Sequence, residues 1–117
     1  MKNIHPKEAF ELLNNNKEAV IIDVRTKDEW NEGIVDCENL KLITITADFG
    51  EFERNLEENI TKKNSDIMFI CRSGRRSETA ALIADKMGYK NNYNVVGGFI
   101  EWNNNNLPSK NLKLGDK

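Results

Sequence analysis

The sequence predicts a single α/β domain whose central, mainly parallel β-sheet is covered by helices on both faces. The chain has 117 residues, which suits one domain of ordinary size. Short apolar runs alternate along it with segments of helical spacing, a pattern typical of βα units. No internal repeat and no Pro/Gly/Ser-rich linker divides the chain. We therefore expect one domain over residues 1–109 and a polar C-terminal tail over residues 110–117.

The first expected elements are a helix and a buried strand. Pro6 suits the first position of a helix, and Ala9, Phe10 and Leu13 then share one apolar face. Residues 19–24 form a short apolar run of the kind seen in buried parallel strands. This part of the chain predicts a helix that packs on a sheet.

The next segment predicts a helical turn over residues 26–32 and a strand over residues 40–45, which is rich in Ile, Leu and Thr. Asp48 with Glu51 three residues later then resembles a capping box, a signal for a helix start. The apolar residues that keep helical spacing after it are Phe49, Phe52, Leu56 and Ile60.

The C-terminal half continues the alternation. Residues 67–70 read as a strand, residues 77–87 as a helix with several alanines, and residues 93–96 as a late strand. A short turn is expected around Trp102. After Pro108 the sequence is polar, and we expect the tail to fray.

Composition and cysteine usage limit the possible functions. The formal net charge is −2, from 17 basic and 19 acidic residues, which argues against a protein whose main partner is nucleic acid. The N-terminus lacks the apolar core of a signal peptide, and no run approaches the roughly 20 apolar residues of a membrane span. We expect a cytoplasmic protein without a membrane partner, with both thiols reduced.

The few metal-binding residue types are scattered. Cys37 and Cys71 form no Cys-x-x-Cys pair, and His5 is the only histidine. This excludes the usual zinc templates and a multi-bridge disulfide scaffold. We therefore expect no metal and no cofactor, a surface position for His5, and no Cys–His catalytic pair.

Functional sites of parallel α/β sheets gather at the carboxyl ends of the strands. That rule selects two segments here, Asp23–Arg25 and the segment that begins at Cys71. The second reads Cys71-Arg72-Ser73-Gly74-Arg75-Arg76, with Ser77 at the start of the expected helix. The sequence therefore places a thiol beside three arginines at a strand-to-helix junction.

A nucleophilic thiol must ionise, and a free cysteine with a pKa of about 8.5 is mostly protonated at neutral pH. A helix dipole contributes about 2 kcal/mol at most, and one pKa unit corresponds to about 1.4 kcal/mol, so the dipole lowers the pKa by roughly one unit. Curled loop amides, which Gly74 makes easier, and guanidinium charge must supply the rest. We expect Cys71 to be an ionised, solvent-accessible thiolate; burial away from solvent would argue against this assignment. An inert packing cysteine is the alternative.

The sequence resembles the rhodanese homology domain over nearly all of its length. Three motifs carry the resemblance, and their order and separation make it specific. They are Asp23-Val24-Arg25 with Glu29-Trp30 and Glu32-Gly33; Cys71 to Arg76; and Val95-Val96-Gly97-Gly98-Phe99 through Trp102, followed by Leu107-Pro108.

The resemblance implies a rhodanese-like fold and a sulfurtransferase reaction. Cys71 would take a sulfane sulfur atom from an anionic donor such as thiosulfate, hold it as a persulfide, and pass it to a thiophilic acceptor, a cellular thiol or a protein cysteine. Asp23 and Arg25 would support the site through charge-assisted hydrogen bonds. The residues expected to bind substrate are Arg72, Ser73, Gly74, Arg75, Arg76 and Ser77.

Within that set, Arg72 and Arg76 are the main candidates for binding the donor, and Arg75 is a weaker one. Arg75 and Arg76 can alternatively be read as a solvated helix start. Thiosulfate is favoured over mercaptopyruvate because a dianion gains more from several arginines than a monoanion does.

Other readings remain open. The resemblance weakens at residues 34–39, where the family's usual His is absent and Cys37 lies, either as a resolving thiol for Cys71 or as a semi-buried bystander. A cysteine phosphatase or arsenate reductase would need Cys-x5-Arg, but position 77 is Ser77. A non-catalytic rhodanese-like interaction module is the remaining alternative.

Overall fold

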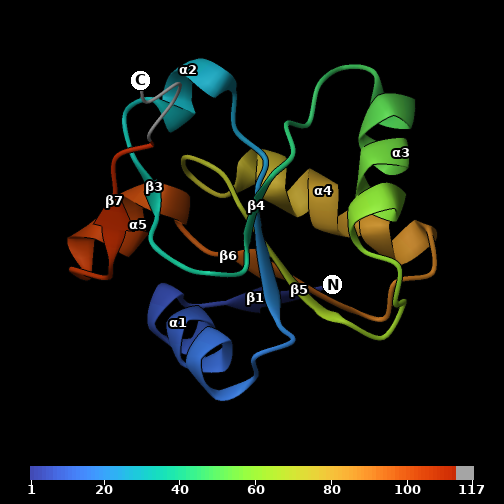
Figure 1. Ribbon diagram of the computed structural model, residues 1–117. Helices are drawn as coiled ribbons and strands as arrows, with labels where there is room; N and C mark the ends of the chain where they lie inside the picture. The colour runs from blue at the N-terminus through green and yellow to red at the C-terminus, as the bar shows by residue number, and fades with distance from the viewer. Residues whose placement is uncertain (113–117) are drawn as a thin grey trace.

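A computed structural model describes residues 1–112 and places five strands in one sheet, in the order β1-β6-β5-β2-β4 (Figure 1). Every neighbouring pair in this sheet is parallel. In that order the strands are Lys2–Ile4, Asn91–Val95, Asp66–Ile70, Val20–Asp23 and Leu40–Leu42. The predicted α/β class with a mainly parallel central sheet is confirmed.

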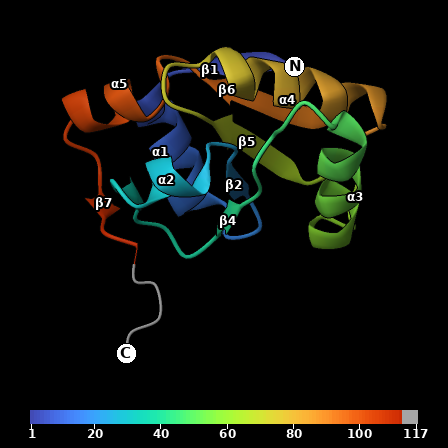
Figure 2. The same cartoon turned by 90° about the horizontal axis from the view of Figure 1, so that it is seen from above.

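Helices cover both faces of the sheet. They are α1 (Pro6–Asn15), α2 (Lys27–Trp30), α3 (Phe49–Asn59), α4 (Arg75–Lys86) and α5 (Gly98–Asn104). In Figures 1 and 2, α3 and α4 lie together at the right, and α1 and α5 lie together at the left. Since neighbouring strand residues point to opposite faces, Ile21 joins the core under α1 and α5, and Ile22 joins the core under α3 and α4.

Several predicted boundaries shift by a few residues. The strand expected over residues 40–45 ends at Leu42, although the amide of Ile43 still donates to the Asp23 carbonyl at 3.1 Å. The helix expected from residue 77 begins at Arg75, because Gly74 takes a left-handed conformation and serves as its N-cap. Short-range signals fix such ends only approximately.

Three short strands were not predicted. β1 has one buried residue, Ile4, and β3 (Ile34–Val35) and β7 (Ser109–Lys110) have two residues each, too few to show a period. β3 and β7 pair antiparallel, so the expectation that the chain frays after Pro108 is wrong for Ser109 and Lys110. Asn111 and Leu112 have no regular structure, and residues 113–117 of the expected tail lie outside the described residues.

Two neighbouring strands, β2 and β5, form the topological switch point of the sheet. β2 and β5 are adjacent, but β2 has β4 on its other side and β5 has β6. Asp23, the last residue of β2, is in register with Ile70, the last residue of β5. The segments that leave these two strands therefore start side by side, at the position where open α/β sheets hold ligands.

Candidate active site

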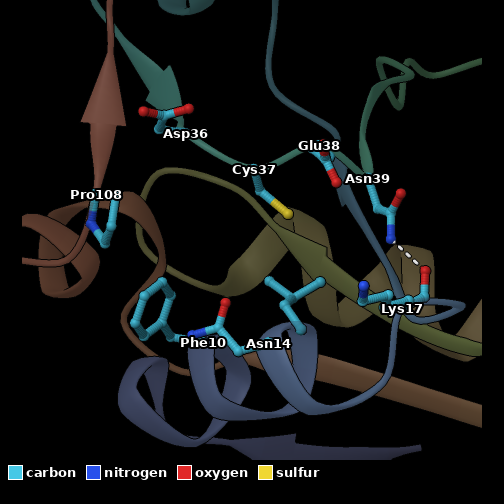
Figure 3. A pocket seen from close by; sticks show the side chains of 9 residues that line it. Phe10, Asn14, Lys17, Asp36, Cys37, Glu38, Asn39 and Pro108 are labelled. Atoms are coloured by element: carbon cyan, nitrogen blue, oxygen red, sulfur yellow. Dashed lines mark hydrogen bonds between the residues drawn. The ribbon is translucent and has the colours of Figure 1, made fainter.

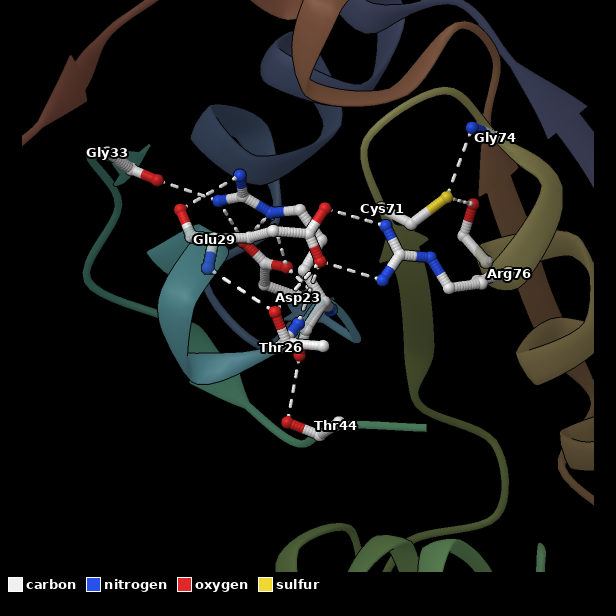
Figure 4. Close-up of polar contacts among 10 residues, drawn as sticks. Asp23, Thr26, Glu29, Gly33, Thr44, Cys71, Gly74 and Arg76 are labelled. Atoms are coloured by element: carbon white, nitrogen blue, oxygen red, sulfur yellow. Dashed lines mark hydrogen bonds and ion pairs between the residues drawn. The ribbon is translucent and has the colours of Figure 1, made fainter. Parts of the chain in front are cut away.

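The loop after β5 curls around the sulfur of Cys71 (Figure 4). The amide of Gly74 donates to Sγ at 3.1 Å, and Oγ of Ser77, in the first turn of α4, lies 3.2 Å from Sγ. Gly74 has φ +107°, which lets the chain turn back on itself within this short loop. The sulfur thus faces polar hydrogens at the start of a helix, as the sequence predicts for Cys71.

Hydrogen bonds favour the ionised form of this thiol. Burial raises the pKa of Cys71, while the Ser77 hydroxyl and the amides of Ser77, Gly74 and Ser73 lower it, and the balance is a pKa below the usual value. These hydrogen bonds are larger contributions than any guanidinium group. The Ser77 hydroxyl and the loop amides therefore lower the pKa of Cys71 more than the arginines do.

The expectation that Cys71 is accessible to solvent is wrong for this conformation. Only 1% of the residue is exposed, and it belongs to the core cluster between the sheet, α3 and α4. The loop folds over the sulfur, and α5 packs against the other side of the loop. In this conformation the residue offers almost no surface to a sulfur donor.

The N-terminus of α5 supports the loop from behind. The amides of Phe99 and Ile100 donate to the carbonyls of Cys71 and Arg72 at 2.8 and 3.2 Å. Gly98, with φ +60°, lies so close that a Cβ there would be 2.4 Å from the Cys71 carbonyl oxygen. The sequence pattern marked this glycine as part of a motif, but its role appears only in three dimensions.

Arg76 forms a two-pronged ion pair with Glu29 of α2 (Figure 4). Nη1 and Nη2 of Arg76 donate to Oε1 and Oε2 of Glu29, each at 2.8 Å. These hydrogen bonds are the main reason that the pKa of Glu29 is lowered to about 2. A predicted donor-binding arginine therefore already has a carboxylate partner, which the sequence did not reveal.

Arg72 and Arg75 are exposed, and neither forms an ion pair within residues 1–112. Arg72 also lines a pocket of about 230 Å³ beside Phe99 and Asn103. Of the three arginines expected to bind the donor, Arg72 has a charge without an ion-pair partner within residues 1–112 and also lines a pocket. Its role in donor binding stays a prediction.

Asp23 and Arg25 form a buried ion pair beside the loop. Nη2 of Arg25 donates to Oδ2 of Asp23 at 2.8 Å and to the Gly33 carbonyl at 2.7 Å. The guanidinium also stacks on the Phe99 ring, 4.4 Å from its centroid. These contacts join the end of β2 to the segment after α2 and to α5, next to the Cys71 loop.

Ser77 links the sulfur to a residue that sequence reasoning missed. Its hydroxyl donates to Oδ1 of Asn94, on β6, at 2.6 Å. Ser77 and Asn94 are both buried, 0% and 6% exposed. Nothing in the sequence signals this contact, because Asn94 lies in a strand between ordinary core residues.

Cys37 lies in a separate cavity of about 480 Å³ between α1 and the segment after β3 (Figure 3). Burial raises the pKa of Cys37, with the neighbouring Glu38 and Asp36 adding to the effect. Cys37 packs against the core under α1 and α5, whereas Cys71 belongs to the core on the other face of the sheet. Both thiols are free, and the sheet separates them.

His5 and the acidic residues form no metal site in the part of the chain described. His5 is exposed and caps α1, its Nδ1 accepting from the amide of Lys7 at 3.2 Å. Residues 1–112 contain no group of three or more His, Cys, Asp or Glu side chains placed to hold a metal ion. No helix within the same residues has the length and apolar character to cross a bilayer.

Comparison with known proteins gives consistent matches. The family model "Rhodanese-like domain" matches residues 5–105. An uncharacterized protein of Rickettsia prowazekii is 38% identical, over 92% of this chain and 96% of its own length. A Schizosaccharomyces pombe protein named "Putative thiosulfate sulfurtransferase, mitochondrial" is 36% identical, over 74% of this chain and 64% of its own length.

A solved structure extends the match to the whole chain. The polysulfide-sulfur transferase homodimer of Wolinella succinogenes is similar with a TM-score of 0.82 and 28% identity, covering 100% of this chain and 83% of that one.

Proposed function

Since the chain belongs to the rhodanese-like domain family, we propose that it transfers sulfane sulfur from thiosulfate through a persulfide on Cys71. Relatives named as sulfur transferases support an activity of this type. The observation that carries this proposal is the environment of Sγ. The Gly74 amide donates to the sulfur at 3.1 Å, and the Ser77 hydroxyl lies 3.2 Å from it, close enough to donate to the anion once the thiol ionises.

The proposed reaction has two displacement steps. The thiolate of Cys71 attacks the outer sulfur of thiosulfate, the S–S bond breaks, and sulfite leaves with the bonding electron pair. An acceptor thiolate or cyanide then attacks the outer sulfur of the persulfide, and Cys71 leaves as the thiolate. The chain needs no cofactor for these steps, because each is a two-electron substitution at sulfur.

The loop residues have complementary parts in this scheme. The amides of Ser73, Gly74 and Ser77 that stabilise the thiolate would also stabilise the persulfide anion, whose charge lies on the outer sulfur, one S–S bond of about 2 Å beyond Sγ. Arg72, which is exposed and lines the pocket beside Phe99 and Asn103, would attract the thiosulfate dianion. Since Cys71 is 1% exposed, loop opening would precede attack.

Position 77 argues against the phosphatase or arsenate reductase alternative. Ser77 is buried and hydrogen-bonded to Asn94, so no arginine closes a ring around a tetrahedral oxyanion there. A non-catalytic interaction module is less favoured, because such a role does not need a cysteine whose pKa is lowered.

Intact-mass spectrometry tests the proposal. The protein is incubated with thiosulfate, freed of small molecules and weighed without reductant. We expect the addition of one sulfur atom, which Cys71→Ser abolishes and Cys37→Ser preserves. An unchanged mass with turnover of an aryl phosphate would favour the phosphatase, and an unchanged mass without turnover would favour the interaction module.

A donor panel with cyanide as acceptor tests the choice of thiosulfate. Polysulfide belongs in the panel because the name of the Wolinella succinogenes protein specifies it. Mercaptopyruvate supplies a monoanionic comparison. We expect thiosulfate to give the highest kcat/KM, and a preference for either other donor would overturn that part of the proposal.

A further inference from the structure

A chain of hydrogen bonds leads from the reactive sulfur to the edge of the sheet. Sγ of Cys71 lies 3.2 Å from Oγ of Ser77, and this hydroxyl donates to Oδ1 of Asn94 at 2.6 Å. Nδ2 of Asn94 donates in turn to Oδ1 of Asn3 at 3.2 Å. The chain thus passes from the loop through α4 and β6 to β1, and its two middle members are buried.

The hydrogens available for these contacts fit only one protonation state of Cys71. A serine hydroxyl carries a single hydrogen, and that of Ser77 is directed at Asn94. The remaining contact must then be a thiol S–H of Cys71 that donates to Oγ. The geometry corresponds to the neutral thiol, whereas attack on a sulfur donor needs the thiolate.

Ionisation of Cys71 forces a rearrangement. The Ser77 hydroxyl must turn toward the sulfur anion, and its oxygen would then face Oδ1 of Asn94 at 2.6 Å with no hydrogen between them. Two acceptors at this distance repel each other, and water has little access to a buried pair. Some donor has to replace the lost hydrogen.

We propose that Asn94 is a positioning residue that acts on Cys71 through Ser77, with its amide turning over when the thiol ionises. After a half-turn about the Cβ–Cγ bond, Nδ2 donates to Oγ of Ser77 and Oδ1 faces Asn3. Asn3 is exposed, and its amide turns in the same way to donate to Oδ1. The thiol proton leaves to a solvent base, and no group is oxidised or reduced.

Asparagine suits this position because one side chain offers both a donor and an acceptor. A carboxylate at position 94 can only accept, so it holds the Ser77 hydroxyl away from the sulfur. The inference rests on the proposed function only in taking the thiolate as the reactive form. The ionisable groups around the sulfur stay unchanged in the test: Asp23 and Arg25 after β2, Glu29 on α2, Arg72 and Arg75 in the loop, Arg76 on α4 and Glu101 on α5.

The first experiment is a double-mutant cycle read by the pH dependence of iodoacetamide alkylation, in a Cys37→Ser background that leaves one thiol. Asn94→Asp and Ser77→Ala are made singly and together. The added charge raises the pKa of Cys71 in either background, but the hydroxyl effect requires Ser77. We expect Asn94→Asp to raise the pKa by about one unit more with Ser77 present than with alanine there.

The second experiment uses the native side chain, so it stands even if Asn94→Asp fails to fold. The ¹⁵N and ¹H resonances of the Asn94 side-chain amide are followed through the titration of Cys71. We expect them to shift with the same midpoint as the thiol, and to stay constant in Ser77→Ala. Constant resonances in the unmodified protein, or equal effects of Asn94→Asp in both backgrounds, would overturn the proposal. Neither measurement uses a sulfur donor, so a protein without sulfurtransferase activity would still give a clear answer.

Discussion

Arg76 and Glu29 hold each other through two parallel hydrogen bonds of 2.8 Å, which join α4 to α2 beside the Cys71 loop. Fork-to-fork pairs of this kind fix geometry as well as charge. The guanidinium is thereby kept near the sulfur and is partly neutralised. An arginine that the sequence assigns to the substrate has a structural partner.

This ion pair predicts a specific pH dependence of stability. The folded protein lowers the pKa of Glu29 from its ordinary value of 4.5 to about 2, so its contribution is complete above about pH 4.5 and is lost as the pH falls toward 2. We expect Glu29→Gln to lower the free energy of unfolding by on the order of 1–3 kcal/mol at pH 7, the range reflecting partial exposure. Urea unfolding from pH 7 to pH 3 checks this, and the difference from the unmodified protein should shrink over that range. Glu32→Gln, an exposed position after the same helix, is the control; an equal effect there would contradict the prediction.

The free charge of Arg72 predicts a selective effect on donor binding. Arg72→Ala should raise the KM for thiosulfate about tenfold, the equivalent of about 1.4 kcal/mol, with a smaller change in kcat. Arg76→Ala should change the KM less, because Glu29 already holds that guanidinium. Steady-state kinetics with cyanide as acceptor measures both. Full activity in both variants would show that neither arginine binds the donor.

A substitution at Gly98 should have a steric effect that the same substitution at Gly88 lacks. Gly98→Ala places a methyl group 2.4 Å from the Cys71 carbonyl, whereas the same change at Gly88 meets no atom within 4 Å. Both positions have positive φ, so both variants carry about 1–2 kcal/mol of backbone strain. We expect Gly98→Ala to cost about 1–3 kcal/mol beyond Gly88→Ala, measured by urea unfolding. It should also slow Cys71 alkylation at fixed pH, and equal costs would contradict this role for Gly98.

The two thiols should react differently. The pKa of Cys71 is lowered and that of Cys37 is raised, so at pH 7 iodoacetamide should modify Cys71 first. Because Cys71 is 1% exposed, a bulky maleimide should react with it more slowly than with a small-molecule thiol of the same pKa. Peptide mapping after timed quenching identifies the modified residue. Faster modification of Cys37 would contradict the assignment.

Much of the fold follows from local patterns in the sequence. The buried strands at β2 and β5 and the helices α1, α3 and α4 have apolar periods long enough to be seen, and the strand-end rule locates Asp23 and Cys71. β1, β3 and β7 escape because two or three residues show no period, and their pairing partners are distant in the chain.

The site is less predictable than the fold, since its details are contacts between distant segments. Glu29 belongs to a motif of the family resemblance and forms a capping box with Thr26, but neither signal predicts that it also binds Arg76. Asn94 gives no signal at all. The burial of Cys71 depends on how α5 packs behind its loop. The residue types near Cys71 do not predict this packing.

The contacts between α5 and the loop also determine where the loop amides point. In a planar trans peptide the carbonyl oxygen and the following N–H project in opposite directions. Once Ile100 holds the Arg72 carbonyl to the rear, the Ser73 amide is directed to the front, where it lowers the pKa of Cys71. A helix that binds the carbonyl side of the loop therefore orients the donors on the sulfur side, and we expect substitutions in that helix to change the pKa of the cysteine.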